Sequence, residues 1–238
     1  MRGLTYTISP EIFKKYPGYA RGVVVAYDVN NGPSPAKLIQ MLRVAEASVA
    51  NKTSIESITE FPHIKAWREA YKAFGAKPSE FRSSVEAMAR RALRGDQLPS
   101  INALVDIGNI VSLQHLVPVG GHSMDDLSEN ISLRLASGDE NFVAFGSTEL
   151  EHPMPGEVIF TEGNTVLTRR WTWRQANHTL TLPETRSIEI NIDRLAPVPL
   201  EEIHTIASQV MGLVEEFCGG RMRYEILSEN HNQMKLEM

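Results

Sequence analysis

The chain has 238 residues, of which 42% are hydrophobic and 22% are charged, and it carries a formal net charge of −5 at pH 7. These proportions are typical of a globular protein with one sizeable core, and they exclude a disordered chain. The sequence holds no long apolar run and no signal-peptide pattern, so we expect a cytoplasmic protein that is neither membrane-spanning nor secreted. Its one cysteine, Cys218, excludes a disulfide within the chain.

Hydrophobic periodicity predicts the secondary structure in two parts. Before residue 115 we expect mostly helices, with two strands among them: strand 4–8, a short helix after Ser9, strand 21–28, then helices at 38–50, 64–74, 79–93 and from Ser100 onward. After His122 we expect strands at 131–135, 141–145, 157–160, 165–168 and 187–193, then a long helix through 203–217 and a return strand at 224–227.

This order of elements predicts an α+β fold. We expect one compact domain over residues 1–228, with the helices of the N-terminal half packed on a mainly antiparallel, barrel-like sheet from the C-terminal half. The remaining segment, 229–238, is polar, and we expect it to fray.

Charge is distributed unevenly along the chain. Residues 1–120 carry 15 Lys and Arg against 10 Asp and Glu, whereas residues 121–238 carry 9 against 19. The basic excess lies between Lys65 and Arg94, which allows a local phosphate-facing patch on an acidic molecule. A solvated helix face is the alternative interpretation of the same residues.

The strongest site signal is the predicted helix in the middle of the chain. Its Asn102, Asp106 and Asn109 recur at helical spacing and share one face, where polar groups must face water, cap a strand or line a pocket. Directly afterwards, Pro118–His122 is typical of a turn, and its two glycines let the backbone approach a ligand closely. We interpret this polar face, the turn and the histidine as a candidate site; a histidine on a surface loop is the alternative.

A second candidate is the segment Arg169–Gln175, in which tryptophan and arginine alternate. On a strand end this places Trp171 and Trp173 on one face, with Arg174 beside them. Such a platform can stack on a terminal adenosine or an aromatic side chain while the arginine reaches a phosphate or carboxylate. Two core tryptophans flanked by solvated arginines are the alternative.

The central helix also resembles a known family. Ile101–Val111, followed by Val117 and Pro118, is similar to the signature helix of the B3/B4 editing module in the beta subunit of bacterial phenylalanyl-tRNA synthetase. The resemblance reaches back to Arg90–Leu93 and forward from Glu157 to Asp193. It implies a barrel-like mixed α/β module that hydrolyses tyrosine wrongly esterified to the phenylalanine tRNA. The chain lacks room for a synthetase catalytic core, so it resembles a free-standing version of the module.

The family's site residues carry over in part. Asn109 resembles one wall of the editing pocket, whereas Gly108 replaces the hydroxyl residue before it. The histidine expected two residues after the proline is replaced by Gly120, and His122 can supply an imidazole two positions later. The glutamate that reads the tyrosine hydroxyl falls near Asn191, which can donate or accept a hydrogen bond but lacks the charge.

These residues lead to the hypothesis of a trans-acting aminoacyl-tRNA deacylase, with the tRNA acceptor end and its amino acid as partners. An aminoacyl ester is already activated, so a positioned water and a few dipoles suffice. We assign Asn109 and His122 to orient water and carbonyl, with further pocket residues for binding: Asp106, Gly108, Gly120, Gly121, Trp171, Trp173, Arg174 and Asn191.

Other functional classes remain open at this point. P-loop, GxGxxG, HExxH and CxxC motifs are absent from the sequence, so we expect no cofactor and no metal site. The first alternative is a non-catalytic module that binds RNA or an amino acid on the same scaffold. The second is a metabolic protein that binds a small molecule and only reuses the fold.

Overall fold

The computed structural model describes residues 3–237. The helices are α1 Pro10–Lys15, α2 Ala36–Val49, the 3-10 helix η1 Ile58–Glu60, α3 Pro62–Ala73, α4 Ser84–Leu93, α5 Ala103–His115 and α6 Leu200–Phe217. The strands are β1 Leu4–Ile8, β2 Ala20–Tyr27, β3 Val119–Ser123, β4 Ile131–Leu135, β5 Phe142–Val143, β6 Leu150–Glu151, β7 Val158–Glu162, β8 Thr165–Arg169, β9 Arg174–Gln175, β10 Ile188–Arg194, β11 Arg221–Leu227 and β12 Gln233–Leu236.

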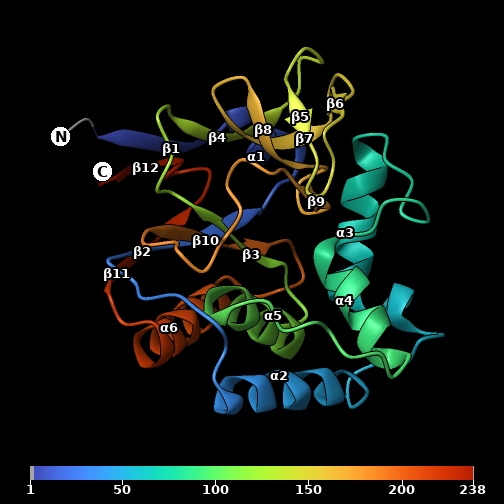
Figure 1. Cartoon of the computed structure of the whole chain (residues 1–238). Helices are drawn as coiled ribbons and strands as arrows, with labels where there is room; N and C mark the ends of the chain where they lie inside the picture. The colour runs from blue at the N-terminus through green and yellow to red at the C-terminus, as the bar shows by residue number, and fades with distance from the viewer. Residues whose placement is uncertain (1–2, 238) are drawn as a thin grey trace.

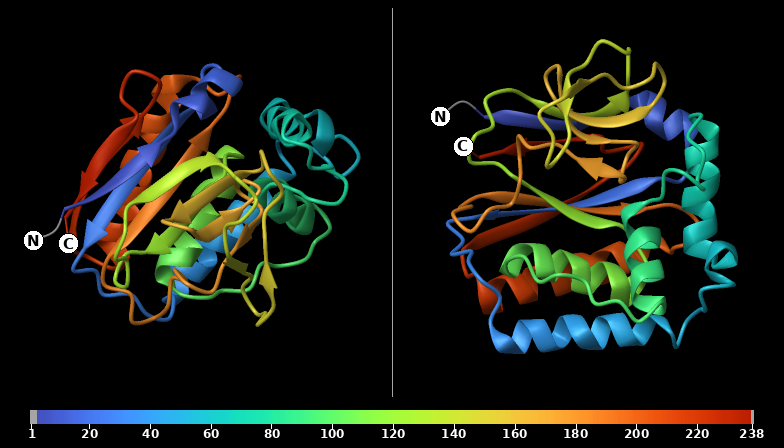
Figure 2. Two further views of the ribbon diagram at one scale, coloured as in Figure 1. Left: turned by 90° about the horizontal axis from the view of Figure 1, so that it is seen from above. Right: turned by 45° about the vertical axis from the view of Figure 1, so that its right-hand side comes forward.

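Two large sheets lie one above the other, with helices beneath the lower sheet (Figure 1), and β5 and β6 form a separate two-stranded sheet. The upper sheet has the order β12-β1-β4-β7-β8-β9 and the lower sheet the order β11-β2-β10-β3. Pairing is antiparallel except between β1 and β4. Helices α5 and α6 pack under the lower sheet and α2 packs against α5. Figure 2 shows α3 and α4 standing beside this stack.

This arrangement confirms the α+β fold and corrects its details. Strands β1 and β2 come from the N-terminal half and lie inside the two sheets, and helix α6 comes from the C-terminal half. Within residues 3–237 no ladder of hydrogen bonds joins the two sheets, so they form an open stack rather than a barrel. No helix of the described chain combines the length and apolarity that a membrane crossing requires.

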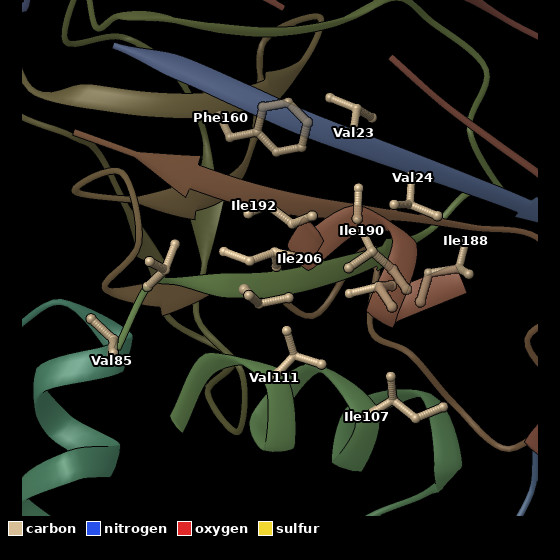
Figure 3. Close-up of a cluster of buried hydrophobic side chains, with 14 of the residues drawn as sticks. Val23, Val24, Val85, Ile107, Val111, Phe160, Ile188, Ile190, Ile192 and Ile206 are labelled. Carbon is tan, nitrogen blue, oxygen red and sulfur yellow. The ribbon is translucent and has the colours of Figure 1, made fainter. Parts of the chain in front are cut away.

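Strand β10 explains why the layers stack in this way. Its Ile188, Ile190 and Ile192 point toward the helices and share one apolar core with Ile107 and Val111 of α5 and Ile206 of α6 (Figure 3). Its other face carries Glu189, Asn191 and Asp193, and it turns toward the upper sheet. The strand is therefore buried on both faces, one apolar and one polar.

Helix α5 begins at Ala103, later than the start at Ser100 that the sequence suggested. Asn102 rather than Ser100 is the N-cap: its side-chain oxygen accepts a hydrogen bond from Val105 N at 3.1 Å, and its amide donates to Thr181 O at 2.8 Å. A capping asparagine satisfies one of the free N–H groups of the first turn. The second bond ties the helix to the segment that precedes β10.

Three local expectations differ from the structure. Residues 119–123, expected as a turn, form edge strand β3 because β10 pairs with them. Residues 170–173, expected as part of a strand, form a turn in which Arg170 and Trp171 have positive φ values of 47° and 64°. Within the polar tail expected to fray, residues 233–236 form β12, which pairs with β1.

Candidate functional site

A cleft wraps around the open edge of β3. Its polar compartment, of about 230 Å³, lies between the two sheets, and its apolar compartment, of about 470 Å³, lies between β3 and the start of α5. Both compartments are lined by residues 119–121 and 173–175. A cleft with an apolar part and a few convergent polar groups is the usual form of a small-ligand site.

The ladder between β3 and β10 decides which backbone groups face the cleft. Asp193 N donates to Pro118 O at 3.0 Å, and Met124 N donates to Ser187 O at 2.8 Å. Because antiparallel pairs alternate, Gly120 directs its N–H and C=O toward β10, and Gly121 directs its own outward. The outward Gly121 carbonyl accepts from Gln175 Nε2 at 3.2 Å, which leaves the Gly121 N–H on the open edge.

The two glycines have different surroundings. A Cβ atom added to Gly121 would lie 2.9 Å from Ile188 Cδ1 and 3.2 Å from the backbone oxygen of Glu189, so a side chain there would force its neighbours to shift. A Cβ atom added to Gly120 would meet nothing within 4 Å. A Cβ atom at position 120 would therefore disturb no neighbour, and the absence of a side chain there keeps the cleft open.

His122 is held tightly in the wall of the polar compartment. It is 6% exposed; its Nδ1 lies 2.7 Å from Thr179 Oγ1, and its Nε2 lies 3.0 Å from Thr168 Oγ1. Burial lowers the pKa of His122 to about 3, and the positive charge of Arg21 contributes to the shift. The imidazole is therefore neutral at physiological pH.

The neighbours of His122 also bear on its tautomer. The amide nitrogen of Gln175 lies 3.2 Å from His122 Nδ1, but its two hydrogens suit the carbonyl oxygens of Gly121 and Thr179. The Thr179 hydroxyl, 2.7 Å from Nδ1, can donate to it, and in that tautomer Nε2 carries the hydrogen and donates to Thr168. The Thr168 hydroxyl hydrogen is then available to donate into the compartment that Thr168 lines.

Behind this wall lies a buried polar network that connects β1, β2 and β10. Arg21 is 1% exposed and bonds to Asp193 Oδ1 through Nε at 2.8 Å and through Nη2 at 2.7 Å. Its Nη1 donates to the Tyr6 hydroxyl at 2.5 Å, and that hydroxyl donates to Asn191 Oδ1 at 2.7 Å. The guanidinium and the carboxylate are thus paired, as buried charges must be. Arg21, Asn191 and Asp193 all line the polar compartment.

Glu189 ends this network. Its Oε1 accepts from Asn191 Nδ2 at 3.1 Å, and its Oε2 has no hydrogen-bond partner among the described residues. Burial raises the pKa of Glu189 to about 8; the positive charge of Arg21 opposes the shift, and the negative charge of Asp193 adds to it. The carboxyl is therefore mostly protonated at neutral pH.

The polar face expected on the central helix divides into three roles. Asn102 caps the helix, as described above. Asp106 is fully buried and accepts from Ser100 Oγ at 2.5 Å and Ser34 Oγ at 2.6 Å, so it holds the chain before α5 in place. Asn109 lines the apolar compartment together with Gly108. Asn109 and His122 therefore border different compartments of the cleft.

The two tryptophans of the second candidate also have different surroundings. Trp171 is 2% exposed and packs edge-on against Tyr16, Tyr19 and Trp67, in an aromatic cluster at the floor of the polar compartment. Trp173 is half-buried and borders both compartments.

Arg170 holds Trp173 in position. Its guanidinium carbon lies 3.7 Å from the ring centre of Phe81 and 4.4 Å from that of Trp173, a cation–π arrangement. Arg174 is exposed at the mouth of the cleft and forms no salt bridge within residues 3–237. It is thus placed to meet an anionic group of a ligand.

Several residues in or around the cleft were not predicted as site residues from the sequence: Tyr6, Arg21, Thr168, Gln175 and Thr179. The first two are far from the others along the chain, and they join the site only through sheet pairing. One signal was present, because the alternation in 188–193 places Glu189, Asn191 and Asp193 on one face. In the described part of the chain no three His, Cys, Asp or Glu side chains are arranged to hold a metal ion.

Comparison with known proteins identifies the family. The sequence profile of the B3/4 domain matches residues 66–217, from within α3 to the end of α6. The chain belongs to the B3/4 domain family. This match confirms the family expected from the central helix, and it includes every residue that lines the two compartments except Arg21.

Two further comparisons complete this picture. A search of curated proteins gave no match. Among solved structures, the chain is similar to an N-terminal fragment of the phenylalanyl-tRNA synthetase beta subunit from Pyrococcus horikoshii, with 12% identity and a TM-score of 0.47. The similarity covers 92% of this chain and 50% of that fragment, so the chain spans half of the fragment's length.

Proposed function

We propose that the cleft around β3 binds the aminoacylated 3′ end of a tRNA and hydrolyses its ester, which removes a wrongly attached amino acid. The observation that carries the proposal is the pairing of an apolar compartment of about 470 Å³ with a polar one of about 230 Å³ across a shared glycine wall. An amino acid side chain suits the first compartment. The ester and the ribose suit the second, and the resemblance of the central helix to an editing module supports the same substrate class.

The chemistry needs little from the protein, because the ester is already activated. A water molecule adds its oxygen to the carbonyl carbon, and the bond between that carbon and the ribose oxygen breaks. The ribose oxygen takes up a proton from the water and leaves as a hydroxyl group. The Gly121 N–H and the Thr168 hydroxyl are the donors that stabilise the oxyanion. In this mechanism Asn109 orients the water from the apolar side, whereas His122 is a positioning residue that acts through Thr168.

The remaining predicted residues bind the substrate in this proposal. Trp173 stacks on the terminal adenosine and Arg174 contacts a phosphate, while Trp171 and Asn191 form the floor beneath the ester. Gly108 and Gly120 leave space for the ligand, and Asp106 contributes only by holding α5. The proposal places the chain in the cytoplasm, where aminoacylated tRNAs are used.

A second candidate function is a non-catalytic module that binds the same ligand. It is favoured by one observation: both ring nitrogens of His122 are bonded to protein groups and its pKa is lowered to about 3. The polar compartment then holds no free imidazole that could act as a general base.

The experiment is a deacylation assay with a panel of correctly and wrongly charged tRNAs. We expect selective loss of one class of ester, and Thr168→Val should slow that loss by at least ~10-fold while tRNA binding is retained. If the wild-type protein binds tRNA but hydrolyses none of the esters, the deacylase proposal is overturned and the non-catalytic binding module is the remaining function. Loss of both would remove tRNA as the ligand of this cleft.

A further inference from the structure

A basic groove adjoins the apolar compartment of the cleft. It has a volume of about 470 Å³ and lies along α4 and the segment that leads to α5. Four arginines line it: Arg82, Arg90, Arg91 and Arg94. One acidic residue, Asp96, lines it as well.

Two of these groove-lining arginines are each held by the protein through a hydrogen bond of Nε. Arg90 donates through Nε to Glu86 Oε1 at 2.9 Å, and Arg91 donates through Nε to Gln97 O at 2.9 Å. Their Nη groups form no hydrogen bond with any residue from 3 to 237, and neither does the guanidinium of Arg94. A guanidinium fixed in this way presents a planar fork that matches the oxygens of a phosphate.

The groove stays positive despite its acidic neighbours. Glu86 is 1% exposed and is shared by Arg68, Arg82 and Arg90, so it offsets only part of their charge. The chain as a whole carries a net charge of −5, which on average repels a polyanion. A phosphate chain would therefore approach the molecule at this groove.

The groove and the apolar compartment share two lining residues, Ile101 and Asn109. A strand that lies in the groove would therefore reach the cleft at these two residues. We propose that Arg82, Arg90, Arg91 and Arg94 bind the backbone phosphates of an RNA strand whose 3′ end enters the cleft past Asn109. This inference rests on the proposed function, because it assigns the surface that holds the substrate's RNA.

The test compares two double variants that remove the same charge. Arg91→Gln/Arg94→Gln changes the groove and spares Arg90, which bonds to buried Glu86; Lys14→Gln/Lys15→Gln changes two exposed residues of α1. Binding of a labelled single-stranded RNA oligomer ending in CCA is followed by fluorescence anisotropy over a range of salt concentrations. Thermal unfolding checks that both variants fold.

We expect the arginine variant to bind the oligomer at least ~10-fold more weakly at low salt, because losing a hydrogen bond to a charged group weakens binding by about this factor. The slope of log affinity against log salt should fall by about 1.4, the value for two lost contacts to single-stranded phosphates. The lysine variant should bind like wild type. Equal losses of RNA affinity in the two variants, or no RNA binding by the wild type, would overturn the proposal that the groove binds RNA.

A second substrate separates this inference from the proposed function. Adenosine esterified with an amino acid offers the ester without any phosphate. If the arginine variant hydrolyses it like wild type but loses RNA affinity, both proposals stand. If the arginine variant keeps both its RNA affinity and its hydrolysis, only the proposal that the groove binds RNA is overturned. If the arginine variant loses RNA affinity but even the wild type hydrolyses no ester, only the proposal of deacylase activity is overturned.

Discussion

Glu189 gives the sharpest test of the buried network, through the substitution Glu189→Gln. Its carboxyl pKa is raised from 4.5 to about 8 by burial, with Arg21 opposing the shift and Asp193 adding to it. Between these values the folded chain holds a proton that the unfolded chain has released, so raising the pH favours unfolding. Glu189 therefore destabilises the wild type progressively from pH 4.5 to pH 8.

The expected magnitude follows from the shift. Each pH unit in this window costs about 1.4 kcal/mol, so the free energy of unfolding falls by up to about 5 kcal/mol by pH 8 because of this group. Glutamine has nearly the same shape as the protonated carboxyl and does not titrate. The variant should therefore resemble wild type near pH 5 and become more stable than wild type as the pH rises.

The assay is denaturant unfolding of both proteins at several pH values from 5 to 9. The difference between variant and wild type removes the contributions of other groups. His122 is one of them: its pKa is lowered, so its stabilising effect is lost as the pH falls from 6.5 toward 3. Glu229→Gln, the same change at an exposed turn, is the control. A difference that does not vary with pH would show that Glu189 ionises normally in the folded chain.

Three further predictions concern the cleft and its support. The rate of ester hydrolysis should show no inflection between pH 6 and 7, because His122 has a pKa of about 3; a bell centred there would make it a general base. Asp106→Ala should lower the free energy of unfolding by roughly 3 kcal/mol in denaturant melts, since the Ser34 and Ser100 hydroxyls and the Ile101 N–H lose their buried acceptor; an unchanged value would contradict its structural role. Asn109→Ala should slow hydrolysis by at least ~10-fold, and an unchanged rate would remove it from the mechanism.

Local patterns in the sequence predicted much of the fold. Strand 187–193 illustrates the reason: its strict alternation specifies a strand whatever the rest of the chain does. Its isoleucines pack in the core shared with α5 and α6, and its polar residues face the upper sheet. The long amphipathic helix through 203–217 is equally local, and it appears as α6.

The features that the sequence did not reveal depend on distant partners. Pro118–His122 has the composition of a turn, but pairing with β10 makes residues 119–123 a strand. Arg170 and Trp171 adopt positive φ because distant groups hold the turn: Glu157 accepts from Arg170 N at 3.1 Å, and Tyr19 packs on Trp171.

The same limit applies to the candidate site. Asn109, His122 and Asn191, which line the candidate cleft, could be predicted as candidates because each stands beside a recognisable pattern. Arg21 was hidden in an apolar strand, and its partner Asp193 lies 172 residues away. Their assignment to a polar pocket required the stacking of two sheets, which no local periodicity specifies.

The central claim is that the cleft around β3 holds the aminoacyl ester, and Gly120→Leu tests it most directly. The new side chain meets no atom within 4 Å of its Cβ and fills the space shared by the two compartments. Gly212→Leu, at an exposed position of α6, is the matched control, since its added Cβ also meets nothing within 4 Å. With the aminoacyl-tRNA that the wild type prefers, Gly120→Leu should lower kcat/KM by roughly 100-fold and the control should leave it unchanged. A folded Gly120→Leu protein that deacylates this substrate at the wild-type rate would contradict the account.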